Sequence, residues 1–122
     1  MNDDLNSKPV FELEERTFLF AKNVRLYLRK LPTSIAVIED GKQVIRASGS
    51  VGANYIEANE SLSKKDFLMR VKICRKEAKE SAYFLRLIFE TCAIEFQKEG
   101  KDLHDEAIQL KKILSAIIEK SK

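Results

Sequence analysis

The stretch SKKDFLMRVKICRKEAKESAYFLRLIFETC, residues 63–92, decides the fold. Its apolar or small side chains recur at alternating intervals of three and four residues, at Phe67, Val71, Cys74, Ala78, Ser81/Ala82, Leu85, Ile88/Phe89 and Cys92. This spacing is typical of one buried stripe on an α-helix. Ser63 can cap the helix through its hydroxyl. Asp66, three residues later, completes an arrangement that resembles a capping box with an aspartate in place of glutamate. A pattern sustained over so many turns predicts a long helix of a helical bundle.

Two segments before this one have the same periodicity. Residues 10–31 form a stripe that Pro32 ends, with acidic residues in the first turns and basic residues in the last, as the helix dipole favours. The second helix is expected to begin near Thr33 or Ser34, since either can act as a cap. Gly41 leaves open whether this segment is one helix or two shorter helices.

The fourth helix is expected to begin at Asp102, after a short polar loop that contains Gly100. Four amphipathic helices joined by short loops predict an all-α, antiparallel, up-and-down four-helix bundle. The single domain is expected at residues 10–120. The polar residues 1–9 are expected to form a flexible N-terminal lead-in.

Length and composition restrict the class of protein. The chain has 122 residues, 44% hydrophobic and 34% charged, which suits one globular domain with a buried core. Cys74 and Cys92 would lie about 27 Å apart on one helix, too far for a disulfide. Unpaired thiols, the lack of a signal peptide and the lack of a long apolar run predict a cytoplasmic protein with no membrane partner.

Two helices carry apolar residues outside their core stripes. On the first helix these are Phe11, Phe18, Leu19 and Leu26; on the third they are Met69, Ile73, Phe84 and Leu87. Contiguous exposed apolar patches are rare on monomeric proteins. We therefore expect a homo-oligomer with these flanks in the subunit interface; isolated, singly exposed side chains are the alternative.

Charge is segregated along the chain, although the net charge is only +3. Residues 1–15 carry five acidic residues and one lysine, whereas residues 16–31 carry five basic residues and no acidic one. Basic residues share one face on each of two helices, and the candidates for nucleic-acid contact are Lys22, Arg25, Arg29, Lys72, Arg75, Lys79 and Arg86. A solvated lysine-rich surface is the alternative.

Residues with catalytic or metal-binding chemistry form no recognisable constellation. His104 has no second histidine and no Cys-x-x-Cys motif to complete a zinc site. Glu77 and Glu80 lie on a basic helix, where balancing charge is their simplest role. We expect a non-enzymatic protein without metal or cofactor; an enzyme is the least favoured alternative.

The stretch QVIRASGSVGANYIEA, residues 43–58, contains GSVG, which alone matches the short Gly-x-x-Gly loop of some RNA-binding modules. The period of the surrounding residues favours a helix instead, in which Ser48 and Gly52 let a neighbouring helix pack closely. Another side of this helix carries a polar ladder, either solvated or hydrogen-bonded to another helix or subunit. Its members are Gln43, Arg46, Ser50, Asn54 and Glu57.

Residues 43–58 and 63–88, with ELEERTFLFAKNVRLYLRKLP at residues 12–32, resemble the four-helix-bundle proteins encoded in intervening sequences of bacterial 23S ribosomal RNA genes. The resemblance implies a ring-like homopentamer. It also implies a relation to accessory bundle proteins of diversity-generating retroelements, which are basic pentamers that bind nucleic acid and a reverse transcriptase.

Structured RNA or DNA, and a reverse-transcriptase-like or other protein, are therefore the partners that the resemblance implies. It supplies no motif-defined active site. A protein–protein interaction bundle that binds no nucleic acid is the alternative function.

Overall fold

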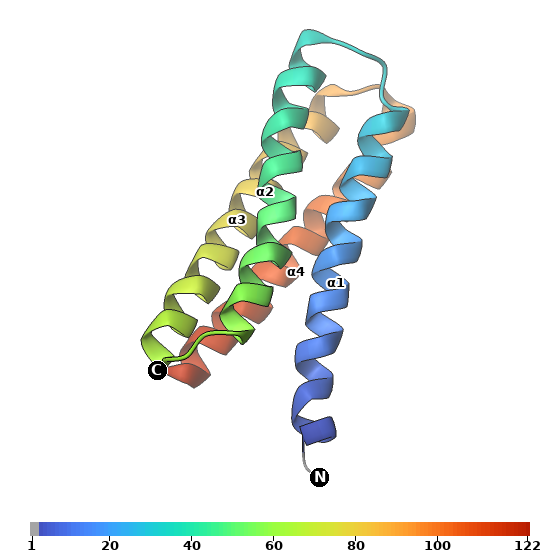
Figure 1. Ribbon diagram of the computed structural model, residues 1–122. Helices are drawn as coiled ribbons and strands as arrows, with labels where there is room; N and C mark the ends of the chain where they lie inside the picture. Colours follow the sequence, from blue (N-terminus) through green and yellow to red (C-terminus); the bar gives the residue numbers. More distant parts are fainter. Residues whose placement is uncertain (1–2) are drawn as a thin grey trace.

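The chain folds into an antiparallel bundle of four long helices (Figure 1). The computed structural model describes residues 3–122. The elements are α1 (Asp3–Lys30), α2 (Ile35–Asn59), α3 (Lys64–Thr91), the short 3-10 helix η1 (Ile94–Phe96) and α4 (Gln97–Ser121). Residues 3–122 contain no strand, so the predicted all-α four-helix bundle is confirmed.

The buried stripes of the four helices meet in one core. On α3 the predicted stripe is confirmed, since Val71, Cys74, Ala78 and Leu85 are completely buried. The other helices contribute Phe20, Val24, Tyr27, Val44, Val51, Leu110 and Leu114, among others. Each large apolar side chain buried in this way contributes about 1.5–3 kcal/mol.

Serine caps define where α2 and α3 begin. The hydroxyl of Ser34 accepts a hydrogen bond from the Val37 amide at 3.1 Å, and the hydroxyl of Ser63 accepts one from the Asp66 amide at 3.1 Å. Such caps are worth about 1 kcal/mol each. Between them α2 is continuous through Gly41, which is buried, so the helix has no break there.

The start of α1 differs from the expected start at Val10. The helix begins at Asp3, so residues 3–9 are helical, and residues 1–2 lie outside the described part of the chain. Pro9 therefore lies inside α1. Proline fixes φ close to the helical value, so a helix can continue through it at the cost of a hydrogen bond and some strain.

The start of α4 also differs from the prediction. The helix begins at Gln97, so Gly100 is a buried helical residue and does not lie in a loop. A Cβ atom at this position would meet the Tyr27 hydroxyl and would lie 2.6 Å from Phe89 Cβ. The missing side chain therefore lets α4 pack closely against its neighbours, and this tertiary contact outweighs the low helix propensity of glycine.

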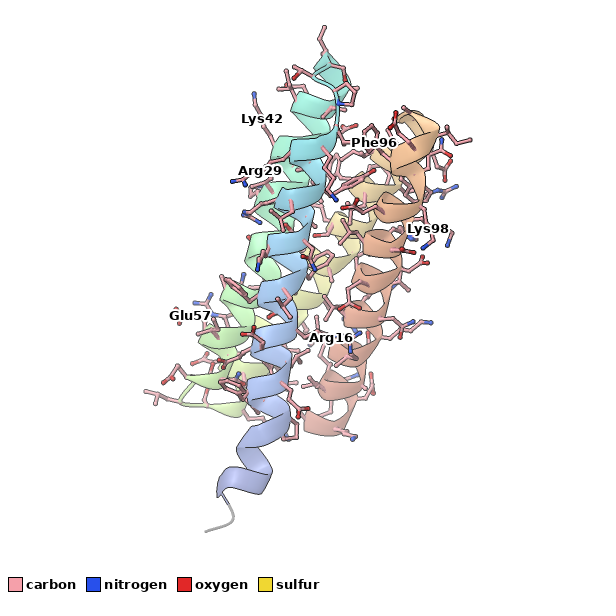
Figure 2. The ribbon with its side chains drawn as sticks, turned by 90° about the vertical axis from the view of Figure 1, so that its right-hand side faces the viewer. Arg16, Arg29, Lys42, Glu57, Phe96 and Lys98 are labelled. Carbon is pink, nitrogen blue, oxygen red and sulfur yellow. The ribbon has the colours of Figure 1, made fainter. Side chains whose placement is uncertain are left out.

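The first helix is the least closely packed of the four. α3 lies along both α2 and α4, whereas α1 approaches α2 less closely and α4 least. Figure 1 shows the N-terminal end of α1 extending beyond the end of α2. Two ion pairs link α1 to α4: Arg16 with Glu106 at 2.8 Å and Lys30 with Glu99 at 2.9 Å. Figure 2 shows Arg16 on the side of α1 that faces α4.

Candidate functional site

A basic cleft of about 410 Å³ lies between α3 and α4. It is lined by Lys72, Arg75, Lys76, Lys79, Lys111 and Ser115, and we call these six residues the basic cleft. The helical repeat places residues three and four apart on the same side of a helix, which explains the grouping on each helix. No acidic residue lines the cleft, and within residues 3–122 none of its five basic side chains forms an ion pair.

The structure brings together only part of the predicted basic set on α3. Lys72, Arg75 and Lys79 line the basic cleft, but Arg86 does not. The Arg86 guanidinium forms an ion pair with Glu90 at 2.7 Å, in a separate depression of the α3 surface. Its charge is therefore already balanced within its own helix.

Three residues of the basic cleft were missed by sequence reasoning. Lys76 follows Lys72 by four residues, so the helical repeat could have found it. Lys111 and Ser115 come from α4, and their position opposite α3 depends on how the two helices pack. The sequence contains no local signal for that packing.

An apolar groove of about 510 Å³ lies between α1 and α2. Small residues form its floor, at Ala21, Gly49, Gly52 and Ala53. Larger apolar side chains flank them, at Phe18, Leu26 and Ile56. Thr17 and four charged residues complete the lining: Glu14, Lys22, Arg25 and Arg29. We call this the apolar groove. The prediction of close approach at Gly52 is confirmed, because a Cβ atom there would lie 2.9 Å from Thr17 Oγ1.

The predicted basic residues of α1 therefore lie far from the basic cleft. α1 packs between α2 and α4, and so does α3, which places the α1–α2 and α3–α4 gaps on opposite sides of the bundle. Arg25 is held against α2, since its guanidinium donates hydrogen bonds to the carbonyls of Ala21 at 2.9 Å and Ile45 at 3.2 Å. The two predicted basic sets do not form one continuous surface.

The apolar flanks are exposed to different degrees. Phe18 is 60% exposed and Met69 is 51% exposed, as expected for residues outside the core stripes. Ile73 and Phe84 are partly buried, and the Phe84 ring packs edge-to-face against Tyr83 at 5.2 Å. Leu87 is exposed. A role for these residues in a subunit interface stays a prediction.

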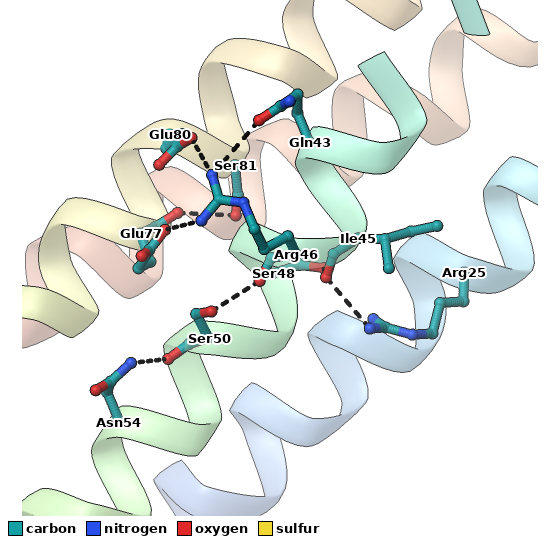
Figure 3. A network of polar contacts seen from close by, with 10 residues as sticks. All are labelled: Arg25, Gln43, Ile45, Arg46, Ser48, Ser50, Asn54, Glu77, Glu80 and Ser81. Carbon is teal, nitrogen blue, oxygen red and sulfur yellow. Dashed lines mark hydrogen bonds and ion pairs between the residues drawn. The ribbon is translucent and has the colours of Figure 1, made fainter. Parts of the chain in front are cut away.

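The polar ladder of α2 faces α3 of the same chain (Figure 3). The Arg46 guanidinium donates to Glu80 at 2.7 Å and lies 3.9 Å from Glu77. It also approaches Gln43 at 3.5 Å. The predicted hydrogen-bonded network against another helix is therefore present within one chain, and its centre is Arg46.

The remaining members of the ladder make mostly local contacts. Asn54 accepts a hydrogen bond from Arg70 of α3 at 3.1 Å and donates one to the Ser50 carbonyl at 2.9 Å. The Ser50 hydroxyl donates to the Arg46 carbonyl. Glu57 forms no side-chain hydrogen bond within the described part of the chain, and it lies near the turn between α2 and α3.

Glu77 is a buried carboxyl group inside this network. It is only 7% exposed, and its Oε1 atom has no hydrogen-bond partner among the described residues. Burial first, and then the neighbouring Glu80, raises the pKa of Glu77 above its ordinary value, although Arg46 acts in the opposite direction. The network therefore contains a carboxyl group whose ionisation opposes folding.

Other reactive side chains have structural surroundings. Cys74 is buried, and burial raises the pKa of its thiol to about 12, which makes it a poor nucleophile. Cys92 is half-buried and ends α3. The His104 ring packs against Phe89 at 5.7 Å. Among the residues that the structure describes, no group of three His, Cys, Asp or Glu could hold a metal ion, and no helix is long and apolar enough to cross a membrane.

Comparison with known proteins agrees with this architecture. The family profile of the 23S rRNA-intervening sequence proteins matches residues 11–116. The chain belongs to this family. A crystal structure of a protein of unknown function, from the S23 ribosomal protein family of Bacteroides thetaiotaomicron, is similar with a TM-score of 0.71 and 28% sequence identity. The similarity covers 86% of this chain and 96% of that one. No curated protein matches the chain. The family resemblance and the helical bundle are thus confirmed.

Proposed function

We propose that this protein is a non-enzymatic homo-oligomer that binds structured RNA or DNA through the basic cleft. One observation carries the proposal: five basic side chains surround the cleft without an acidic partner. Lys72 and Lys79 are about 10 Å apart along α3, a length over which one strand of duplex DNA presents about three phosphates. The cleft is therefore long enough, and has enough positive charge, to contact several phosphates of one backbone.

RNA is the first polyanion to test. The family is named for an intervening sequence of 23S rRNA, and the Bacteroides protein is described as a member of a ribosomal protein family. These names connect the relatives with ribosomal RNA, which is the reason to test RNA first. The cleft offers lysine and arginine donors, which contact phosphates without reading base sequence, so we expect recognition of charge and shape.

Self-association, with a ring-like homopentamer as the proposed form, would strengthen this binding. Each added protomer repeats the basic cleft around the symmetry axis, so several weak contacts act together on one nucleic acid. The apolar groove supports self-association, because exposed apolar surface flanked by charged residues is typical of protein interfaces. Static light scattering tests this directly; a monomer at micromolar concentration would contradict it.

Removing two cleft charges tests the binding. The Lys76→Gln/Lys79→Gln variant should bind structured RNA roughly 10- to 100-fold more weakly, with a plot of log affinity against log salt flatter by about two phosphate contacts. The matched control is Arg86→Gln/Lys98→Gln, which also removes two charges but at residues already engaged in ion pairs. Equal losses in both variants, or no RNA binding by the unmodified protein at low salt, would contradict the proposal.

A bundle that binds a protein and no nucleic acid is the second candidate function. The apolar groove favours it, since exposed apolar surface suits a protein partner, including a reverse-transcriptase-like one. Capture of one stoichiometric protein, insensitive to nuclease and to salt, would support this function. Loss of the captured partner on nuclease treatment would favour nucleic-acid binding instead.

A further inference from the structure

The turn between α2 and α3 exposes apolar side chains among acidic ones. Leu62 is 100% exposed, and Met69 is 51% exposed. Three carboxylates line the same depression of about 350 Å³, and we call the whole group the acidic turn: Glu57, Glu60, Leu62, Asp66 and Met69.

The carboxylates of the acidic turn are available for a partner. Within residues 3–122 none of the three forms an ion pair. Arg70 is the basic residue that lines this depression, and its guanidinium donates to Asn54 at 3.1 Å. The acidic turn therefore presents a fully exposed leucine within unpaired negative charge.

The apolar groove has the complementary properties. Phe18 and Ile56 expose 60% and 49% of their surface beside a floor of small residues. Lys22 and Arg29 lie at the groove and form no ion pair within the described part of the chain. One surface is thus apolar with mainly acidic neighbours. The other is apolar with three basic neighbours and one acidic one, Glu14, whose carboxylate accepts a hydrogen bond from Asn59 at 2.9 Å.

We propose that the acidic turn of one protomer docks into the apolar groove of a second copy of this chain. This inference rests on the proposed self-association and names its contact. Leu62 and Met69 cover the apolar floor, while the acidic residues face Lys22, Arg25 and Arg29. Opposite charges around an apolar contact orient the partners and exclude other arrangements.

Charge also decides which surfaces pair. Groove against groove would bring the basic residues of two protomers together, and turn against turn would bring the carboxylates together. Pairing the acidic turn of one protomer with the apolar groove of another avoids both repulsions. The acidic turn lies on the α2–α3 side of the bundle and the groove on the α1–α2 side, so one protomer can use both at once. Such a head-to-tail contact repeats from subunit to subunit and can close into a ring.

Two single variants and their mixture test the contact. Ala53→Glu places a longer acidic side chain in the groove at an exposed helical position, and Leu62→Lys replaces the exposed leucine with a base. Each variant alone should raise the dissociation constant for assembly by about 10-fold or more. Mixed together they should form a 1:1 dimer in native mass spectrometry, because Ala53→Glu keeps the acidic turn and Leu62→Lys keeps the groove.

The controls separate this inference from the proposed function. Gln109→Ala, at an exposed position of α4, should assemble as the unmodified protein does, and circular dichroism should show equal helix content in all variants. Wild-type-sized assemblies of both single variants would overturn the contact and leave self-association intact. Loss of assembly without a dimer in the mixture would overturn head-to-tail pairing. A monomeric unmodified protein would overturn self-association itself.

Discussion

The α1–α2 gap and the α3–α4 gap lie on opposite sides of one bundle, and the first is mainly apolar whereas the second is mainly basic. Small residues form the floor of the first, with Phe18 and Ile56 exposed beside it. Five long basic side chains from two helices surround the second. The helical framework is the same on both sides, so side-chain size and charge next to the core stripes decide what each surface can bind. The proposed self-association and the proposed polyanion binding therefore use separate faces of the bundle.

Reversing the charge of the basic cleft should have the largest of the expected effects, a loss of RNA affinity. The Lys72→Glu/Lys76→Glu/Lys79→Glu variant should lose roughly 1000-fold in RNA affinity near physiological salt, because three phosphate contacts become repulsive. Its oligomer size should not change, since the apolar groove is on the other side of the bundle. Filter binding and light scattering on the same samples measure both. If this variant folded but no longer assembled, the basic cleft would contribute to self-association, and the two functions would not use separate faces.

Adding one methyl group in the apolar groove should have a smaller effect, which is a lower free energy of unfolding. In Gly52→Ala the new Cβ atom would lie 2.9 Å from Thr17 Oγ1. Thr17 is completely buried and its hydroxyl donates to the Glu14 carbonyl, so it cannot easily move away. Overpacking minus the gain in helix propensity should cost about 1–2 kcal/mol of unfolding free energy, measured by urea denaturation.

Gly49→Ala is the matched control for this prediction, one helical turn away. A Cβ atom there would meet only the exposed end of the Arg25 side chain, 3.2 Å away, and this end can shift by weakening its 3.2 Å hydrogen bond to the Ile45 carbonyl. We expect Gly49→Ala to be neutral or to stabilise the protein by up to about 1 kcal/mol. If both alanine variants changed stability equally, the close approach of α1 at Gly52 would not be the reason for glycine there.

Replacing the Glu77 carboxyl group, which lies between α2 and α3, should have the smallest effect on stability. Its pKa is raised in the folded state, so its contribution to stability is present below the ordinary pKa of a glutamate and is lost as the pH rises through the folded pKa. Glu77→Gln should remove this loss and stabilise the protein at pH 7.5, with little change at pH 4. Urea denaturation at the two pH values measures the difference.

Glu80→Gln is the comparison for Glu77→Gln, because Glu80 accepts the 2.7 Å hydrogen bond from Arg46 and is more exposed. It should weaken this charge-assisted contact and give no gain at pH 7.5. Neither variant should change RNA binding or assembly, since both residues lie outside the basic cleft and the apolar groove. A greater loss of stability at pH 7.5 in Glu77→Gln than in Glu80→Gln would contradict this account.

Sequence reasoning succeeded where local rules decide the structure. The three- and four-residue spacing located the core residues of α3, and hydroxyl chemistry located the cap at Ser63 and narrowed the first cap to Thr33 or Ser34, of which the structure uses Ser34. It failed at Gly100, because a glycine in a polar stretch of sequence is typical of a loop. In the structure Gly100 is helical because the Tyr27 side chain, from a residue 73 positions earlier in the chain, occupies the position that a side chain at residue 100 would take.

The candidate site was predicted in part for a similar reason. Basic residues on one helix can be grouped by the helical repeat, which found Lys72, Arg75 and Lys79. The contribution of Lys111 depends on which face of α4 meets α3, which no local pattern shows. The ion pair of Arg86 with Glu90, four residues later on the same helix, could have been predicted from the helical repeat. The repeat could not show that the basic residues of α1 lie on the opposite side of the bundle.

Lysine-reactivity footprinting by mass spectrometry tests most directly whether the two faces have separate roles. Three samples are compared: protein diluted below its assembly concentration, assembled protein, and assembled protein with structured RNA. We predict that assembly lowers the reactivity of Lys22 at the apolar groove, and that RNA then lowers the reactivity of Lys76, Lys79 and Lys111 without a further change at Lys22. Protection of Lys22 by RNA, with the lysines of the basic cleft still fully reactive, would contradict the account.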